Sequence, residues 1–241
     1  MIGDPTYLEL ADGIAASLGE VGERVVSENE LAEIHGVSRP TARAALQELE
    51  RRYLVRRVRG AGTFVNRRID YVISADDPPS ATATFRRAGV EPRIEVISAD
   101  TVGAPADVAV HLGVERRTPV TRVRRRLLLD VPTSWSTAYV LAEVAPGLGA
   151  RLGSGDSLYR VLRDEYGVEP RRRWSRASLD HPPDTTIEAL GLEGRPPTWL
   201  IEGVDEDADD PFRAIEFTRS WMRADVVNVV FELGRPPGIV R

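Results

Sequence analysis

The chain has 241 residues, which is long enough for two domains with separate hydrophobic cores. With 42% hydrophobic and 29% charged residues it has the composition of a globular protein, and no apolar run approaches the ~18 residues that a membrane helix needs. The absence of cysteine excludes disulfides and cysteine nucleophiles, and three scattered histidines do not predict a metal site. The first residues lack the basic start and apolar run of a secretory signal. We therefore expect a cytoplasmic two-domain protein without membrane contact.

Positive charge is concentrated in one segment. All 32 basic residues are arginine, and nine of them lie between residues 39 and 68, together with two acidic residues. This segment has a formal charge of +7 in a chain of net charge −5, so the remainder is about −12. Most charge runs are solvated surfaces, but a basic segment in an acidic protein is also typical of a polyanion-binding site. The organisation of the segment favours the second interpretation.

Three helices are predicted in the first fifty residues. Apolar residues recur at helical spacing over roughly residues 6 to 18. Ser27 and Glu30 have the spacing of a capping box for a second helix, and Gly36 is suited to end it. Ser38 is expected to cap a third helix with a small apolar face. That face consists of Ala42, Ala45, Leu46 and Leu49.

The third helix has the features of a DNA-recognition helix. Its apolar face leaves Arg39, Thr41 and Arg43 facing outward near the N-terminus. The runs YLVRRV and TFVN follow, joined by RGAG, and predict a β-hairpin in which Gly60 and Gly62 permit a close backbone approach. A helix-turn-helix followed by a hairpin is a winged helix. Such a domain places arginines at guanine edges in the major groove and its wing at phosphates or the minor groove.

The stretch SENELAEIHGVSRPTARAALQELERRYLVRRVRGAGTFV resembles the N-terminal domain of GntR-type bacterial transcription regulators, whose wing motif RGxGTFV is especially diagnostic. The resemblance covers residues 6 to 66. Val26 departs from the family's usual proline, and Asn29 departs from its usual basic residue, which leaves the operator preference open. The resemblance implies base or phosphate contacts from Arg39, Thr41, Arg43, Gly60, Gly62 and Thr63.

A second domain follows a predicted linker. We divide the chain into a winged helix-turn-helix domain over 1–66, a linker over 67–79 and a second domain over 80–241, because residues 66–80 lose the amphipathic pattern and contain Asp-Asp-Pro-Pro. Helical and strand-like patterns then alternate, and three strands end the chain. Short connections between the late strands predict a mainly antiparallel sheet covered by helices, which is an α+β fold.

The second domain shows no pattern of a catalytic or metal site. It has no glycine-rich nucleotide loop and no nucleophile elbow, and we expect neither enzymatic activity nor a cofactor. Asp205, Asp207, Asp209 and Glu216 imitate a calcium loop, but Asp210 stands where that loop needs glycine. We therefore interpret this acidic run as a solvated hairpin turn.

The run RVRRR is the strongest candidate for ligand binding in the second domain. In a strand, Arg122, Arg124 and Arg126 share one face, while Val123, Arg125 and Leu127 share the other. Three arginines on one face need solvent, acidic partners or a bound anion to offset their repulsion. The residues alone leave an anion site and an ion-paired surface strand as equal alternatives.

Residues 80 to 231 resemble the UTRA effector domain of the HutC branch of the GntR family, through VRRRLLLDVPTSWSTAYV, APGL, SLYRVLRDEYGV and AIEFTRSWMRAD. The resemblance implies a chorismate-lyase-like α+β fold, no enzymatic activity, a homodimer and a small-molecule pocket on the sheet. It assigns the effector's anionic group to Arg124, Arg126 and Ser157. It places Ser136, Arg173, Glu216 and Met222 around the remainder of the ligand, with Ser80 contributing through its loop amides.

Two departures bear on the ligand. Members of the family that bind amino-sugar phosphates have glutamate where this chain has Ser136 and tyrosine where it has Met222. We therefore expect a small anionic effector of a different skeleton, such as a phosphorylated sugar, a phosphonate or a carboxylate.

The sequence predicts a ligand-responsive transcriptional regulator, a repressor, that binds a palindromic double-stranded DNA operator as a homodimer. Two alternatives stay open. One is a constitutive DNA-binding protein whose second domain only dimerises. The other is an enzyme with a DNA-binding appendage.

Overall fold

The computed structural model describes residues 6–58, 60–74 and 80–232. The chain forms two compact units, Met1–Arg68 and Ile69–Arg241. Each unit has its own buried apolar core. The two units are therefore described separately.

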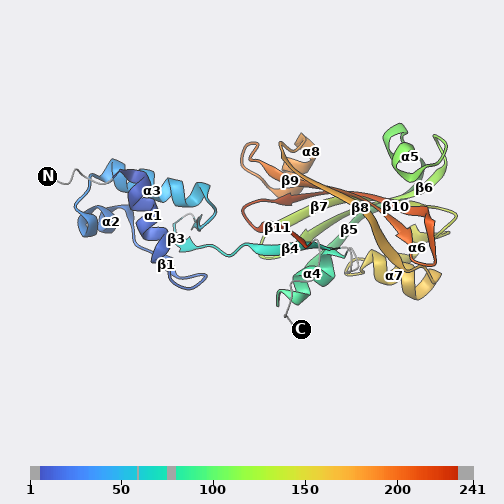
Figure 1. The fold of residues 1–241 in the computed structure, drawn as a ribbon, viewed down its shortest axis with the longest axis horizontal. Helices are drawn as coiled ribbons and strands as arrows, with labels where there is room; N and C mark the ends of the chain where they lie inside the picture. The colour runs from blue at the N-terminus through green and yellow to red at the C-terminus, as the bar shows by residue number, and fades with distance from the viewer. Residues whose placement is uncertain (1–5, 59, 75–79, 233–241) are drawn as a thin grey trace. The chain divides into compact units, whose positions relative to one another are not determined.

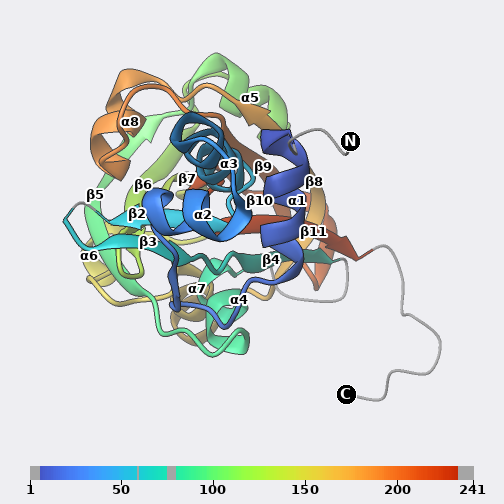
Figure 2. The same ribbon diagram turned by 90° about the vertical axis from the view of Figure 1, so that its left-hand side faces the viewer.

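The first unit combines three helices with a small sheet (Figure 2). The helices are α1 (Tyr7–Ala16), α2 (Glu28–His35) and α3 (Arg39–Arg51). The strands β1 (Arg24–Val25), β2 (Val55–Val58) and β3 (Gly62–Val65) form an antiparallel sheet in the order β1–β3–β2. The short strand β1 was not predicted, and it widens the hairpin into a three-stranded wing.

The local signals of the sequence are confirmed in this unit. The Ser27 amide donates to the Glu30 carboxylate at 2.7 Å, and the Glu30 amide donates to the Ser27 hydroxyl at 3.3 Å. Gly36 ends α2 in the left-handed conformation with φ 63°. The four predicted apolar residues of α3 are buried in the core of the unit. This core fixes which side of α3 faces solvent.

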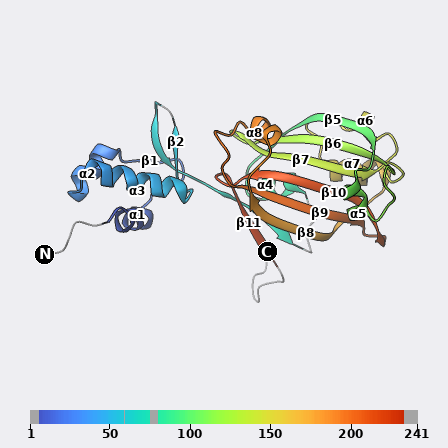
Figure 3. The same ribbon diagram turned by 90° about the horizontal axis from the view of Figure 1, so that it is seen from above.

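The second unit contains a six-stranded antiparallel sheet in the order β5–β6–β7–β10–β9–β8 (Figure 3). The α+β prediction is confirmed. The sheet strands are β5 (Arg93–Gly103), β6 (Pro119–Leu128), β7 (Pro132–Leu141), β8 (Pro170–Asp180), β9 (Thr198–Asp207) and β10 (Asp210–Arg223). The helices are α4 (Ala81–Arg87), α5 (Ala106–Leu112), α6 (Leu148–Arg151), α7 (Leu158–Tyr166) and α8 (Asp184–Leu190).

Helices cover both faces of the sheet. The helices α4, α6 and α7 lie on one face, and α5 and α8 lie on the other (Figure 1). Val123, Ala138 and Ile215 pack beneath α6 and α7, whereas Val120, Val204 and Phe217 pack beneath α5. The face that carries α4 and α7 also carries a cavity lined by residues of β6, β7, β8 and β10.

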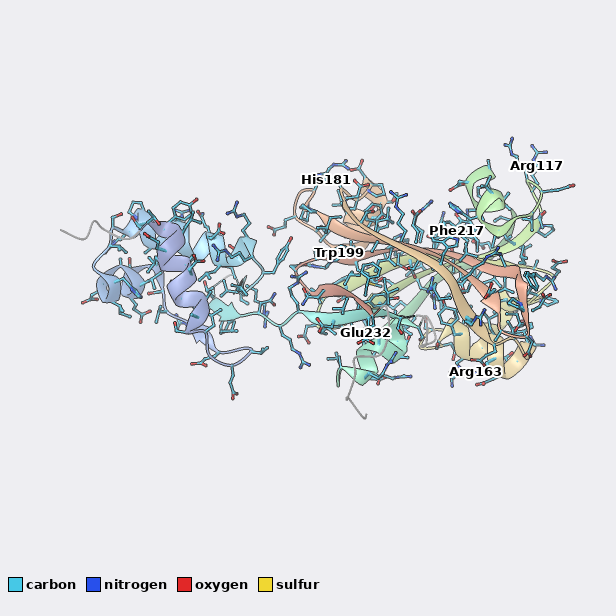
Figure 4. All side chains as sticks on the ribbon, in the orientation of Figure 1. Arg117, Arg163, His181, Trp199, Phe217 and Glu232 are labelled. Carbon is cyan, nitrogen blue, oxygen red and sulfur yellow. The ribbon has the colours of Figure 1, made fainter. Side chains whose placement is uncertain are left out.

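Two expectations about this unit were wrong. Part of the predicted linker 67–79 is the strand β4 (Ile69–Ser74), and the last predicted strand, β11 (Val227–Glu232), pairs with it in parallel instead of joining the large sheet. Residues 75–79 of that predicted linker lie outside the described residues. Ile69 and Tyr71 are buried and alternate with polar or half-buried residues, which is the pattern of a strand. The Asp-Asp-Pro-Pro run that follows led to the prediction of a linker instead. The indole of Trp199, which Figure 4 labels, donates to the Val227 carbonyl at 3.2 Å and links this pair to the sheet.

Candidate functional site

The N-terminal end of α3 presents the residues predicted to contact DNA. The Ser38 hydroxyl accepts from the Thr41 amide at 3.3 Å and lies 2.8 Å from the Thr41 hydroxyl, so it caps the helix as predicted. Arg39 and Arg43 are exposed, and neither forms an ion pair with another described residue. Thr41 is half-buried. Two unneutralised guanidinium groups therefore flank a capped helix terminus.

The predicted wing residues lie at the turn of the β2–β3 hairpin. Gly60 and Gly62 have φ values of 77° and 123°, a region that favours glycine. Thr63 pairs with Arg57 and with Val25, so it lies on the face of the wing that is turned toward the helices. Gly60 and Gly62 remain at the exposed end of the hairpin, while Thr63 lies on its inner face.

A cavity opens on the face of the large sheet that carries α4 and α7. Fifteen residues line it, drawn from strands of the sheet, from β4 and from the first turns of α4 and α7. Four of them are the apolar residues Ala81, Ile94, Leu127 and Ile201. Two are arginines, and none is acidic. Nine carry a hydroxyl group: Tyr71, Ser80, Thr82, Ser134, Ser136, Ser157, Tyr159, Thr218 and Ser220.

The two arginines of the cavity are Arg125 on β6 and Arg172 on β8. The Nε atom of Arg125 is buried and has no hydrogen-bond partner among the described residues. Arg172 is held by Asp205, whose Oδ1 lies 3.1 Å from the arginine Nε. The guanidinium group of Arg125 thus brings to the cavity a buried donor that is not satisfied within the described chain.

The predicted arginines Arg124 and Arg126 do not line this cavity. They lie on the opposite face of β6, where Arg126 donates to the Glu95 carboxylate at 2.6 and 2.9 Å. The predicted alternation of side chains along β6 is present, and it places Arg124 and Arg126 on the face away from this cavity. Val123 and Leu127 flank Arg125 and pack with residues of α4, α6 and α7, so Arg125 lies on the face of the strand beneath these helices.

Arg173 also lies away from the cavity, and its neighbour Arg172 takes its place. The pairing of β8 with β9 shifts between Arg172 and Trp174, which makes Arg173 the extra residue of a β-bulge. Arg173 instead lines an open hollow next to α5, together with Trp174 and Phe212. A bulge changes which face a side chain occupies, and the sequence of β8 gives no sign of it.

The other predicted effector residues lie in or beside the cavity. Ser80, Ser136 and Ser157 line it. Met222 is buried in the apolar cluster that also contains Leu127 and Phe85. Glu216 is fully buried on the same face of the sheet and is not a lining residue.

Glu216 belongs to a buried polar cluster behind the cavity wall. It is the cross-strand partner of Asp205, and both carboxylates are fully buried. The Tyr159 hydroxyl donates to Asp205 Oδ2 at 2.7 Å, whereas both Glu216 oxygens lack a hydrogen-bond partner among the described residues. Burial, and then the neighbouring Asp205, raise the pKa of Glu216 to about 8. At pH 7 Glu216 therefore keeps its proton. Burial also raises the pKa of Asp205, while the charge of Arg172 and the hydrogen bond from Tyr159 oppose that rise.

This burial corrects the interpretation of the acidic run as a solvated turn. Residues 207–210 do form the turn between β9 and β10, and Asp209 is exposed. Asp205 and Glu216, however, lie inside the sheet. Among the described residues, no group of three histidine, aspartate or glutamate side chains could hold a metal ion. No helix in the described part of the chain is long and apolar enough to cross a membrane.

Sequence reasoning missed Arg125, Arg172, Tyr71 and Tyr159 in the cavity. The sequence did contain a signal for Arg125. It shares a strand face with Val123 and Leu127, two apolar residues that predict a buried face. Tyr71 was hidden by the assignment of its segment to a linker. Arg172 required knowledge of the bulge, and no sequence signal separated it from Arg171 and Arg173.

Comparisons with known protein families match both units. Residues 4–65 match the family described as bacterial regulatory proteins, gntR family, and residues 87–228 match the UTRA domain. The second match covers more than half of the chain. The chain belongs to the GntR family of bacterial regulators, in the branch that carries a UTRA domain. The resemblance stated from the sequence motifs is confirmed.

Individual relatives of this GntR-family chain match over most of its length. The transcriptional regulator Rv0792c of Mycobacterium tuberculosis is 30% identical over 82% of the chain and 75% of the relative. The regulator GgaR of Escherichia coli K12 is 28% identical over 95% of the chain and 91% of the relative. The crystal structure of PhnF from Mycobacterium smegmatis covers 96% of the chain and 100% of that structure, with a TM-score of 0.66 and 28% identity. The GntR-family chain is therefore a DNA-binding transcriptional regulator and not an enzyme.

Proposed function

We propose that this regulator is a dimeric repressor whose affinity for a palindromic operator is controlled by a small anionic metabolite bound in the cavity at Arg125. The buried, unpartnered Nε of Arg125 is the observation that carries the proposal. A buried guanidinium N–H without a hydrogen-bond partner is unfavourable unless an anion or water accepts from it. An anionic effector would supply that partner.

The first turn of α7 supports the same ligand class. Ser157 occupies the N-cap position and lines the cavity, but its hydroxyl does not cap the helix. The free amides of a helix N-terminus favour an anion, and a serine hydroxyl can donate to one. The nine hydroxyl groups of the cavity, together with the absence of a lining carboxylate, suit a phosphate, phosphonate or carboxylate.

The relatives support the regulatory part of the proposal. PhnF of Mycolicibacterium smegmatis is named a transcriptional repressor and is 30% identical over 85% of this chain. A structure described as the effector domain of PhnF covers 68% of the chain, with a TM-score of 0.59 and 25% identity. Two winged helices related by a twofold axis would match the symmetry of a palindromic operator.

A ligand screen with matched variants tests the proposal. The melting temperature of the full chain is measured with inorganic phosphate, methylphosphonate, sugar phosphates and small carboxylates, because a ligand that binds only the folded state raises it by mass action. A responding anion should lose its effect in Arg125→Ala and keep it in Arg124→Ala, which removes the neighbouring charge on the opposite face. The responding anion must also change operator affinity. Silence across the panel, or equal operator affinity with and without the ligand, would favour a constitutive DNA-binding protein.

A further inference from the structure

Internal ion pairs sort the arginines of the first unit into two groups. Arg51 and Arg52 pair with Glu48, and Arg52 also pairs with Asp12. Arg57 lies 3.1 Å from a Glu28 oxygen. The formal charge of residues 39–68 is therefore larger than the positive charge that is free to contact DNA. The arginines that form no ion pair within the unit are the candidates for such contacts. Those without a hydrogen bond or ion pair among the described residues are Arg24, Arg39, Arg43 and Arg56.

Two of these four lie on the wing. Arg24 of β1 and Arg56 of β2 both pair in register with Phe64 of β3, the central strand. Residues directly opposite each other in an antiparallel pair share one face, so the three side chains form a row. Both arginines are exposed, and Phe64 between them is half-buried. We call this row, Arg24–Phe64–Arg56, the outer wing face.

The opposite face of the wing is turned toward the helices. Its row consists of Val25, Thr63 and Arg57. Val25 is buried in the core of the unit, and Arg57 pairs with Glu28 of α2 and with Glu50 of α3. The charge of the inner face is therefore neutralised within the domain, whereas neither arginine of the outer wing face forms an ion pair or hydrogen bond with a described residue.

Arg24 extends along the sheet toward the turn of the hairpin. A Cβ placed on Gly62 would lie 3.1 Å from the Arg24 Nε, so the guanidinium stem passes directly over this glycine. Gly62 pairs with Val58 and closes the hairpin, which extends away from the three helices (Figure 3). A residue from outside the hairpin thus delivers a positive charge to its tip.

We propose that Arg24 and Arg56 contact the DNA phosphate backbone beside the wing and extend the footprint beyond the recognition helix. Two exposed guanidinium groups that form no ion pair among the described residues lie next to a glycine turn. This arrangement suits phosphate contacts, which are charge-assisted and independent of sequence. Arg24 precedes the basic segment in the chain, and only the pairing of β1 with β3 brings it there. The proposal adds residues to the DNA-binding activity of the family and does not depend on the effector.

The salt dependence of DNA binding tests this assignment without knowledge of the operator. The affinity of the full chain for a generic 30-base-pair duplex is measured across a range of sodium chloride concentrations. Each phosphate contact contributes about 0.9 to the slope of log affinity against log salt. Arg24→Ala and Arg56→Ala should each lower that slope by about 1 and weaken binding roughly five- to tenfold near 0.1 M salt. The double variant should lower the slope by about 2.

Two further variants distinguish a phosphate contact at these positions from an effect of net charge. Arg24→Lys keeps the charge and should keep the slope. Arg51→Ala removes the same formal charge from an exposed position whose partner Glu48 stays paired with Arg52, and its slope should equal that of the parent chain. Unchanged slopes in both Arg24→Ala and Arg56→Ala, with unchanged melting temperatures, would overturn the proposal. An equal loss in Arg51→Ala would also overturn it, because net charge and not position would then account for the loss.

Discussion

Asp205 and Glu216 face each other across β9 and β10, and both carboxylates are fully buried in the sheet of the effector domain. The Arg172 Nε lies 3.1 Å from Asp205 Oδ1, and the Tyr159 hydroxyl donates to the same carboxylate. Arg172 and Tyr159 also line the cavity. The carboxylate pair is therefore connected to the proposed effector site through two residues that belong to both.

The pKa of Glu216 makes stability depend on pH. Because burial raises this pKa to about 8 from an ordinary value of 4.5, the folded chain keeps a proton that the unfolded chain has released between these two pH values. Stability should therefore fall as pH rises through this window, and the whole penalty is present above pH 8. Glu216→Gln is neutral at every pH and should be more stable than the parent chain at pH 8.5 by a few kcal/mol.

Urea unfolding of the parent chain and of Glu216→Gln at pH 5 and pH 8.5 measures this difference. Other groups that titrate in both proteins cancel when the two curves are subtracted. The advantage of the variant should be small at pH 5 and large at pH 8.5. An advantage that does not change with pH would show that Glu216 is not protonated in the folded chain.

Gly203 leaves room for Arg172. A Cβ on Gly203 would overlap with the Arg172 Nη1 and lie 3.0 Å from the Trp174 carbonyl oxygen. Gly203→Ala should destabilise the second unit by about 1 to 3 kcal/mol through overpacking, and by more if displacement of Arg172 leaves Asp205 unpaired. The measurement is urea unfolding at pH 7.

Gly13→Ala is the matched control for this substitution. Gly13 lies in the middle of α1, and a Cβ there would meet no atom within 4 Å. This variant should stabilise the first unit by up to about 1 kcal/mol, because alanine is the better helix former. A destabilisation of similar size in both variants would argue against the specific role of Arg172.

The hydroxyl of Tyr159 should contribute measurably to stability. Tyr159→Phe removes a buried, charge-assisted donor from Asp205 and should cost about 1.5 to 3 kcal/mol. Tyr166→Phe on the same helix is the control, since its hydroxyl donates to the Pro146 carbonyl at an exposed site and its loss should cost about 1 kcal/mol or less. Equal losses in the two variants would indicate that the buried hydrogen bond to Asp205 stabilises the fold no more than the exposed one to Pro146.

The fold was predictable wherever local chemistry sets the structure. The capping box at Ser27, the left-handed Gly36 and the alternation along β6 all depend on neighbours within a few residues, and the structure confirms each. The parallel pairing of β4 with β11 joins residues more than 150 positions apart. No local pattern encodes such a contact.

The candidate site was less predictable because it depends on which helices pack against each face of a strand. The alternation of Arg124, Arg125 and Arg126 leaves two faces to choose from, and packing of α7 and α4 against the sheet decides between them. On β8, the bulge at Arg173 leaves Arg172 as the arginine that lines the cavity, while Arg173 lines the hollow next to α5. In both strands the arginine that lines the cavity is one position away from a predicted one, and a shift of one residue exchanges one face of the sheet for the other.

The recognition helix makes a separate prediction about sequence specificity. A preferred operator is first selected from random duplexes with the full chain, and affinities for it and for single-base variants are then compared. Loss of a bidentate contact to guanine should cost Arg39→Ala or Arg43→Ala about 1 to 3 kcal/mol and relax specificity at particular positions. Arg24→Ala should instead weaken binding to every duplex by the same factor, because a phosphate contact reads no base. If Arg39→Ala and Arg43→Ala also weakened binding to every duplex by the same factor, α3 would contact only the DNA backbone, and another element of the protein would contact the bases.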